Sequence, residues 1–263
     1  MAEFAGVLHV HSTYSDGELS LGEIAEWARG TGLDFVCITD HSGGAHGKRL
    51  EELCVECERL SDEVLLVPGV EFEHRGRHVL AIAPVKCLLG LTDEVAVEDP
   101  AAVRQGGGLT IWAHPSLTFD FSLRPGIETP YDGWEIWNLR MDGRIPNMPM
   151  AALLQREARW RPLMAFAGLD LHRLPIGKTP VCTVWSEAQE LSLPPLLHAL
   201  RAGDHVMTVC GQPLDLPRRM PARLRSYLRH WAIRARCVAA VGVHRLLKRR
   251  VTDRSAETTE DAT

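Results

Sequence analysis

The sequence predicts an α/β fold of the (β/α)-barrel class, and three observations support this prediction. Short apolar runs, typical of buried strands, alternate along the chain with segments whose apolar residues recur every three or four positions. Strands that alternate with helices in this way form a parallel sheet, and their number here points to a barrel. The length of 263 residues is sufficient for one such domain.

The expected elements follow one another from the N-terminus. The first strand covers residues 5–11, and the first helix covers residues 20–31, where Ser20 and Glu23 have the spacing of a capping box. A buried strand is expected at 34–41 and a second helix at 48–62. Further strands are expected at 64–72, 78–84, 109–115, 133–138 and 163–170, with helical segments near 99–106 and 148–160.

Charge is unevenly distributed along the chain. Residues 1–216 carry 17 basic and 30 acidic side chains, a formal net charge of −13, whereas residues 217–251 carry 11 basic and no acidic side chains. In the basic segment, Leu224, Leu228 and Trp231 fall on one stripe of a predicted helix. We therefore expect a barrel domain at 1–216, a basic amphipathic helical appendage at 217–251 and a disordered polar tail at 252–263.

The basic helix has three open interpretations. It could pack on the acidic domain, bind a nucleic-acid backbone, or lie on an anionic membrane surface through residues 217–250. No apolar stretch is long enough for a transmembrane segment, and no signal-peptide pattern is present, so we expect a cytoplasmic protein. Seven scattered cysteines argue against a disulfide scaffold, and the Cys54/Cys57 pair lies in a helical pattern without a second pair that would complete a zinc site.

The first predicted strand ends in two histidines. His9 and His11 alternate along it, so their side chains are expected on the same face. Alone, such a pair is more often a hydrogen-bonded strand end than a metal site. Five other predicted strands also end in polar residues, namely His41, Glu71, His114, Asn138, and Asp170 with His172. Because the carboxyl ends of barrel strands carry the functional site, these residues are predicted to share one.

Potential metal ligands are abundant at these strand ends. Imidazole together with carboxylate suits Zn, Mn or Fe. Two such ions, roughly 3.5–4 Å apart, can generate a hydroxide nucleophile and hold the attacking and leaving oxygens of a phosphate ester. The candidates number too many for one ion and suit two or three: His9, His11, Asp16, His41, Glu71, His78, His114, Asp170 and His172.

Six motifs in a fixed order resemble the PHP (polymerase and histidinol phosphatase) family: HVHSTYSDG, ITDH, PGVEF, GRHVLAI, AHP and GLDLH, within residues 6–210. The GWEIWN strand further resembles its CehA/McbA-type branch. The resemblance implies a distorted (β/α)7 barrel with a two- or three-metal site. It also implies three ligand sets: a first ion held by His9, His11, Glu71 and Asp170; a second by Glu71, His78 and His114; and a third by Asp16, His41 and His172.

We therefore expect a metal-dependent phosphoesterase. A metal-bound hydroxide would hydrolyse a phosphate mono- or diester of a small molecule or nucleotide, with two or three Mn, Fe or Zn ions as cofactors. The expected catalytic residues are Glu71, Asp170 and His172, and the candidate substrate contacts are Asn138, Arg140, Arg144 and Arg173. Asp40, beside His41, is expected to orient a ligand imidazole.

Three alternatives remain open at the level of sequence. The first is an exonuclease acting on oligonucleotides, and the second is a CehA-like hydrolase of non-phosphate esters. The third belongs to a different class, a non-catalytic binding module that has kept the fold. The presence of a potential ligand at every motif argues against the third.

Overall fold

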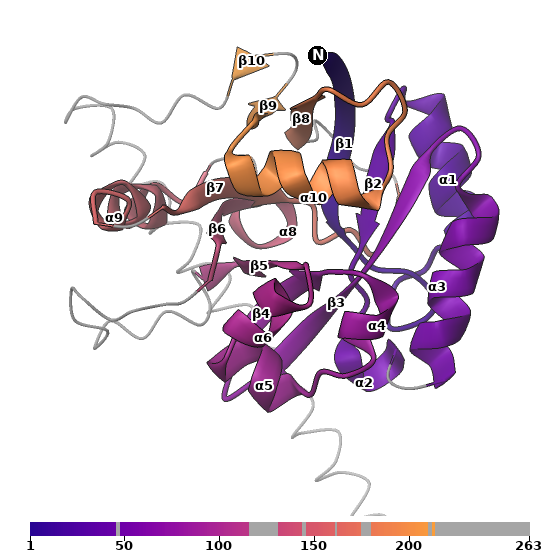
Figure 1. The fold of residues 1–263 in the computed structure, drawn as a ribbon, viewed down its shortest axis with the longest axis horizontal. Coiled ribbons are helices and arrows are strands. Elements are labelled where there is room, and N and C mark those ends of the chain that lie inside the picture. Colours follow the sequence, from indigo (N-terminus) through magenta and orange to yellow (C-terminus); the bar gives the residue numbers. More distant parts are fainter. Residues whose placement is uncertain are drawn as a thin grey trace, which may run out of the picture. The chain divides into compact units, whose positions relative to one another are not determined.

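The expected strands are all present and form one sheet that curves into a barrel (Figure 1). The computed structural model describes residues 1–45, 48–115, 131–143, 146–160, 162–174, 180–209 and 212–213. Its strands are β1 (Ala2–Val10), β2 (Phe35–Ile38), β3 (Leu65–His74), β4 (Arg77–Ile82), β5 (Leu109–Trp112), β6 (Gly133–Asn138), β7 (Met164–Gly168), β8 (Pro180–Ser186), β9 (His205–Val209) and β10 (Gln212–Pro213).

The described helices are mostly short. They are α1 (Leu21–Gly30), α2 (Ser42–Ala45), α3 (Lys48–Leu60), α4 (Val85–Leu88), α5 (Asp93–Glu98), α6 (Ala101–Gln105), α8 (Leu139–Asp142), α9 (Met148–Glu157) and α10 (Leu193–Ala202). The predicted capping box begins α1, because the Ser20 hydroxyl accepts a hydrogen bond from the Glu23 N–H while the Glu23 carboxylate accepts one from the Ser20 N–H.

The strand order is β10-β9-β8-β1-β2-β3-β4-β5-β6-β7. β1, β2 and β3 pair in parallel, and so do β5, β6 and β7. The expectation of a wholly parallel sheet was wrong, because β4 runs antiparallel to both β3 and β5, and β8 runs antiparallel to β1. The strand β8 and the hairpin that it forms with β9 were not predicted.

The reversal at β4 has a local cause. Only Arg75 and Gly76 connect β3 to β4, and both have positive φ, 50° and 72°. This is the backbone of a two-residue type I′ hairpin turn, whose twist matches that of the strands, whereas a parallel connection would need a longer crossover. As a result, the beginning of β4 lies at the same end of the sheet as the carboxyl ends of its neighbours.

The barrel is nearly closed where the segment after β7 reaches β1. The Leu169 N–H donates to the Leu8 carbonyl (3.0 Å), the Leu171 N–H to the His9 carbonyl (3.2 Å) and the His11 N–H to the Leu171 carbonyl (2.9 Å). These bonds form a parallel bridge between Val10 and Leu171. The first and last strands of the predicted motif series are thereby joined at the end of the barrel that carries the polar residues.

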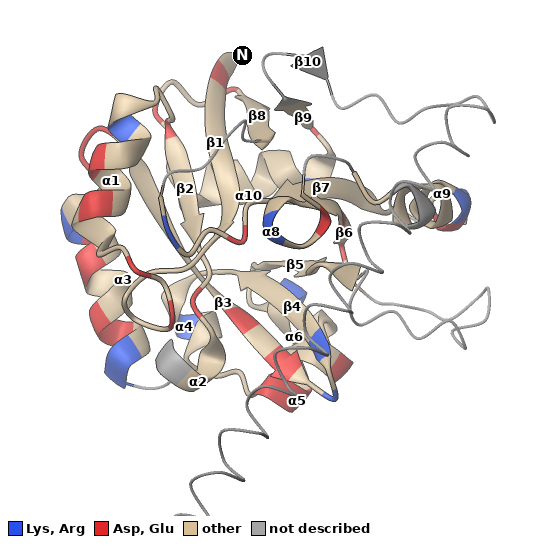
Figure 2. Ribbon diagram, turned by 180° about the vertical axis from the view of Figure 1, so that it is seen from behind, with Lys and Arg blue, Asp and Glu red and all other residues tan. Residues whose placement is uncertain are grey.

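Both faces of the sheet are buried, as the continuous apolar runs predict. On β2, Val36 and Ile38 pack with residues of α1 and α3, while Phe35 and Cys37 pack in a second cluster with α10. Figure 2 shows that Asp and Glu residues recur along the helices α1, α3 and α5, whereas most of the strand residues are uncharged. None of the helices in the described ranges has the length and apolar character needed to cross a membrane.

The two cysteines of α3 do not form a metal or redox site. Cys54 and Cys57 are buried free thiols, and burial raises the pKa of Cys54 to about 11, so neither is a ready metal ligand or redox group.

The C-terminal predictions lie outside the described residues. These are the helix expected at 217–251, the binding surface expected at 217–250 and the tail expected at 252–263.

Candidate metal centre

All nine candidate ligands lie together at one end of the barrel. His9 and His11 come from the end of β1, His41 follows β2, Glu71 lies in β3, His78 begins β4, and His114 follows β5; Asp170 and His172 follow β7. Asp16 comes from the turn after β1. Within four overlapping groups of these residues, donor atoms lie within 4.8 Å of one another: His9/His11/Glu71, His9/His114/Asp170, His41/Glu71/His78 and His11/Asp16/His41/His172.

Glu71 is the centre of this cluster and only 1% exposed. Its Oε1 accepts hydrogen bonds from His78 Nδ1 (3.0 Å) and His114 Nε2 (2.9 Å). Its Oε2 lies 3.4 Å from His9 Nε2, 3.3 Å from His11 Nε2 and 3.2 Å from His41 Nδ1. One carboxylate therefore contacts imidazoles from four different strands or strand ends, which is the arrangement expected of a bridging ligand.

The Glu71 carboxyl group is ionised in this environment. Burial by itself raises its pKa, but the charge of His9 and the hydrogen bonds from His11, His114 and His78 hold the pKa well below its ordinary value. Asp170 behaves in the same way, because nearby His9, His114 and His11 lower a carboxyl pKa that burial would raise. Two buried carboxylates thus remain available as anionic ligands at neutral pH.

The innermost donor atoms have a spacing that fits a divalent ion. His9 Nε2 lies 3.1 Å from His11 Nε2, and both lie 3.3–3.4 Å from Glu71 Oε2. For metal–ligand bonds of about 2.1 Å, adjacent ligand atoms stand about 3.0–3.4 Å apart in octahedral or tetrahedral geometry. Asp170 Oδ1 approaches the same two nitrogens at 3.9 and 3.5 Å. The mutual spacing of His9, His11 and Glu71 is therefore compatible with one divalent ion, and Asp170 is the remaining member of the first set that the family resemblance implies.

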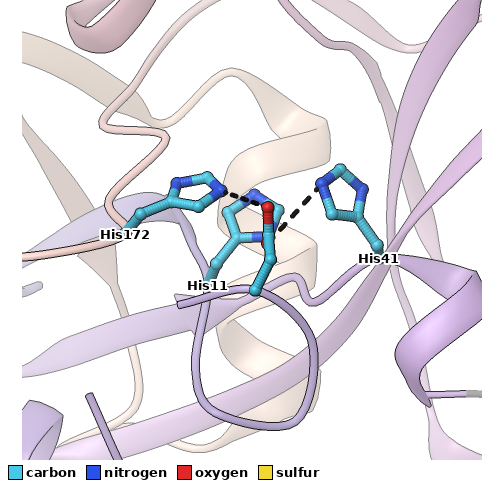
Figure 3. A group of neighbouring side chains, drawn as sticks. His11, His41 and His172 are labelled. Atoms are coloured by element: carbon cyan, nitrogen blue, oxygen red, sulfur yellow. Dashed lines mark hydrogen bonds and ion pairs between the residues drawn. The ribbon is translucent and has the colours of Figure 1, made fainter. Parts of the chain in front are cut away.

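A second group of donors lies closer to solvent. Figure 3 shows the rings of His11, His41 and His172 converging on a common centre. Asp16 joins them: its Oδ2 is 3.1 Å from His172 Nε2, and its Oδ1 is 3.7 Å from His41 Nε2 and 3.5 Å from His11 Nδ1. His11 thus faces the inner group with one nitrogen and the outer group with the other, which the sequence did not indicate.

Exposure increases from the inner to the outer group. His9 and His11 are completely buried, whereas His41 is 33% and Asp16 52% exposed. The cluster therefore opens to solvent on the side of Asp16 and His41.

The pKa values of the two buried imidazoles shift in opposite directions. Burial lowers the pKa of His9, but Glu135, Glu71 and Asp170 together raise it well above 6.5. Burial and repulsion from His9 lower the pKa of His11.

Backbone strain is concentrated at the candidate ligands. His9, His114 and Asp170 have φ values of 64°, 28° and 51°, in the region that side chains other than glycine rarely adopt. At His9 the register of β1 against β2 also shifts. The simple alternation by which we expected His9 and His11 to share a face is therefore interrupted, and the irregular backbone directs both rings to the cluster. Strain of this kind is typical of functional sites.

The four candidate substrate contacts differ in position. Arg140, on α8, lies at the edge of the cluster with Nη1 3.3 Å from Asp170 Oδ1 and 2.8 Å from His172 Nδ1, and its side chain is 51% exposed. Arg173 is exposed, and Arg144 lies outside the described residues. Asn138 is completely buried and both ends of its amide are hydrogen-bonded, to the Met141 N–H and to Glu135, which argues against substrate contact.

The hydrogen bonds of the Asp40 carboxylate go to the loop after β1. It accepts from the Ser12 N–H (2.8 Å), the Ser12 hydroxyl (2.7 Å) and the Ser15 hydroxyl. These bonds fix the loop from which Asp16 reaches the cluster, and the Ser15 Oγ in turn lies 3.5 Å from His11 Nδ1.

The sequence analysis did not identify Glu135, a buried acidic residue in the middle of β6 that contacts the cluster. Its Oε1 accepts a hydrogen bond from His9 Nδ1 at 2.8 Å. A signal was present, because an acidic residue within the apolar strand GWEIWN can be buried only with partners. Only the last residue of that strand, Asn138, was singled out from the sequence.

Residues 8–124 match the protein family described as PHP domain. A curated relative is the DNA polymerase/3'-5' exonuclease PolX of Bacillus subtilis (strain 168), 34% identical over 82 residues. That alignment covers 28% of this chain and 14% of PolX, so the chain matches only a small part of the relative's length.

Two solved structures share the fold at low sequence identity. One is a two-domain protein from Bacteroides vulgatus ATCC 8482 that contains a predicted PHP-like metal-dependent phosphoesterase (TM-score 0.58, 17% identity, 87% of this chain and 70% of that chain). The other is PsfC from Pseudomonas syringae PB-5123 (TM-score 0.60, 14% identity, 89% of this chain and all of that chain). At these identities the likeness concerns the fold.

Proposed function

Because residues 8–124 carry a PHP domain, we propose that the protein is a metal-dependent phosphoesterase whose active site is the cluster around Glu71. The observation that carries the proposal is the convergence of nine imidazole and carboxylate side chains on this buried carboxylate and its surroundings. The fold likeness to a protein with a PHP-like phosphoesterase supports the same reading.

The residues have distinct proposed roles. His9, His11, Glu71 and Asp170 hold an inner ion, Glu71 shares a second with His78 and His114, and Asp16, His41 and His172 hold a third. Divalent ions in these positions would supply an activated water and neutralise the charge of phosphoryl oxygens. Glu71, Asp170 and His172 would fix the separations between the ion positions, because each of these residues contacts ligands of more than one proposed ion.

The substrate is proposed to enter from the exposed side of the cluster. Asp16 and His41 have the most exposed side chains of the nine candidate ligands. Arg140 lies at the same edge of the cluster, beside Asp170 and His172. A guanidinium group at this position can donate hydrogen bonds to phosphoryl oxygens. We therefore assign Arg140 to the phosphate group of the substrate.

A second candidate function is an exonuclease acting on oligonucleotides. The observation that favours it is the 82-residue match to PolX, whose name includes a 3'-5' exonuclease. A phosphodiester of a nucleic acid would place the same phosphoryl chemistry at the same cluster. The two candidates therefore differ in the substrate outside the cluster and not in the proposed ligands.

A substrate screen with metal analysis tests both candidates. Purified protein is expected to contain more than one equivalent of Mn, Fe or Zn by elemental analysis. Metal-loaded protein is then assayed with phosphomonoesters, phosphodiesters, short oligonucleotides, and carboxyl and carbamate esters. Turnover of a phosphoester is expected; turnover of carboxyl or carbamate esters alone would replace the proposal by a non-phosphate hydrolase, and metal-bound protein without any turnover would point to a binding module.

Removal of the Arg140 side chain is expected to weaken use of the substrate phosphate. Arg140→Ala removes a charge-assisted hydrogen-bond donor of a kind that contributes about 1.5–3 kcal/mol, so kcat/KM should fall by about 10–100-fold with metal content retained. The matched control is Arg159→Ala, which removes the same charge from an exposed position beyond α9. Equal kcat/KM values for the two variants would remove Arg140 from the substrate site.

A further inference from the structure

Glu135 is a carboxylate beneath the cluster that receives hydrogen bonds from three directions. It is 1% exposed and lies on β6, between Trp134 and Ile136. Its Oε1 accepts from His9 Nδ1 at 2.8 Å. Its Oε2 accepts from the His114 backbone N–H at 2.8 Å and from Asn138 Nδ2 at 3.0 Å. A buried carboxylate with this many donors is fixed in one orientation.

The hydrogen bond from His9 determines which ring nitrogen is free. A carboxylate only accepts hydrogen bonds, so the proton on the His9 ring facing Glu135 must be on Nδ1. When His9 is neutral, as a metal ligand must be, its lone pair is then on Nε2, the atom that lies 3.1 Å from His11 Nε2 and 3.4 Å from Glu71 Oε2. The neutral ring therefore presents its unprotonated nitrogen to the inner donor group.

We propose that Glu135 is a positioning residue for the inner metal ion: it holds His9 in the tautomer that binds through Nε2, and it fixes the main chain of the second ligand His114. This inference rests on the metal centre of the proposed function, and it adds a residue that belongs to none of the proposed ligand sets. Carboxylates that orient metal-binding imidazoles contribute strongly to metal affinity in general.

Glu135 also contacts two candidate ligands whose backbone conformation is strained. His9 and His114 both have positive φ, a conformation that costs free energy and persists only where surrounding contacts enforce it. Glu135 contacts both residues, His9 through the ring and His114 through the N–H. A single side chain therefore supports two strained ligands from two strands.

The chain also leaves room for this carboxylate at Gly168. A Cβ atom built on Gly168 would collide with Glu135 Oε1 and would lie 2.8 Å from Glu135 Cδ and 3.0 Å from His9 Cβ. The absence of a side chain at the end of β7 is thus required for the Glu135–His9 contact. The contact is specified by residues on β1, β6 and β7 together.

The substitution Glu135→Gln tests the inference because it changes the pattern of donors and acceptors while keeping the shape. The His114 N–H and the Asn138 amide both need an acceptor on the Oε2 side, so the single oxygen of glutamine must face them and its NH2 group must face His9. His9 then accepts at Nδ1 and carries its proton on Nε2, which prevents metal binding by that atom.

The expected result is a loss of about 10–100-fold in affinity for the most tightly held ion, measured by titrating metal-free protein with Zn²⁺ against a chelator. The matched control is Glu26→Gln, which makes the same charge change at an exposed position of α1 and should bind Zn²⁺ as the unaltered protein does. Unchanged affinity and stoichiometry in Glu135→Gln would overturn the proposal.

A measurement on the unaltered protein covers the case in which Glu135→Gln does not fold. In the zinc-loaded protein, 15N NMR of the histidine rings should show His9 protonated at Nδ1 and bound through Nε2. Protonation at Nε2 would overturn the inference. Neither readout depends on turnover, so a protein that binds zinc as expected but hydrolyses no phosphoester would contradict the proposed function and leave this inference intact.

Discussion

Glu71→Gln is expected to reduce phosphoester hydrolysis by more than about a hundredfold and to lower the number of bound metal ions. Glu71 is the proposed ligand that two ions share, so its replacement should lower metal binding more than the replacement of Glu135, which only orients a ligand. The substitution keeps the size of the side chain. However, Oε1 accepts from two imidazoles and Oε2 faces three more, and an amide can present an acceptor on only one of these sides.

Steady-state kinetics and elemental analysis of the same preparation measure this effect. Glu94→Gln, at an exposed position of α5, provides the control for the change of one charge. Circular dichroism establishes whether the barrel is retained. A folded Glu71→Gln protein with full metal content and full turnover would show that Glu71 does not bridge the ligand groups, and the assignment of the active site would then be wrong.

Gly168→Ala is expected to have the second-largest effect, although it adds only one methyl group. The new Cβ would collide with the Glu135 carboxylate, which cannot move aside freely because it is buried and holds three hydrogen bonds. Displacement of Glu135 releases His9, so metal affinity should fall by about 10–100-fold. Overpacking in a close-packed interior should in addition destabilise the fold by about 1–3 kcal/mol.

Chemical denaturation and metal titration together measure this prediction. Gly22→Ala is the matched control, because its Cβ meets no atom within 4 Å and the residue lies in α1, where alanine is the better helix former. The control should be neutral or slightly stabilising. Equal stability and equal metal affinity for both variants would mean that the barrel adjusts at β7 without disturbing Glu135.

The sequence was sufficient to predict the elements that have a repeated local pattern. The strands β1 to β7 are marked by apolar runs, and α1 by a capping box, so each could be recognised without knowledge of its neighbours. The direction of β4 could not be recognised in this way. It depends on a two-residue turn at Arg75 and Gly76, and arginine is an unusual residue at a positive φ.

The candidate site was predicted as a set of residues but not as a geometry. The nine side chains could be listed because polar residues at strand ends stand out against apolar strands. The interruption of β1 at His9 and the sharing of His11 between two donor groups depend on tertiary contacts. Glu135 was missed because it lies within a strand, and reasoning from strand ends does not examine such positions.

The hydrogen-bonded bridge between Val10 and Leu171 has a consequence for how the barrel opens and closes. Glu71 and His78 belong to one hairpin and can approach each other early in folding, as contacts of low sequence separation do. His9 and Asp170 belong to the first and last strands of the series and meet only when the seam closes. A divalent ion held by both would act as a cross-link across the seam. Its removal should therefore accelerate local opening along β1 and β7 before it affects the rest of the barrel.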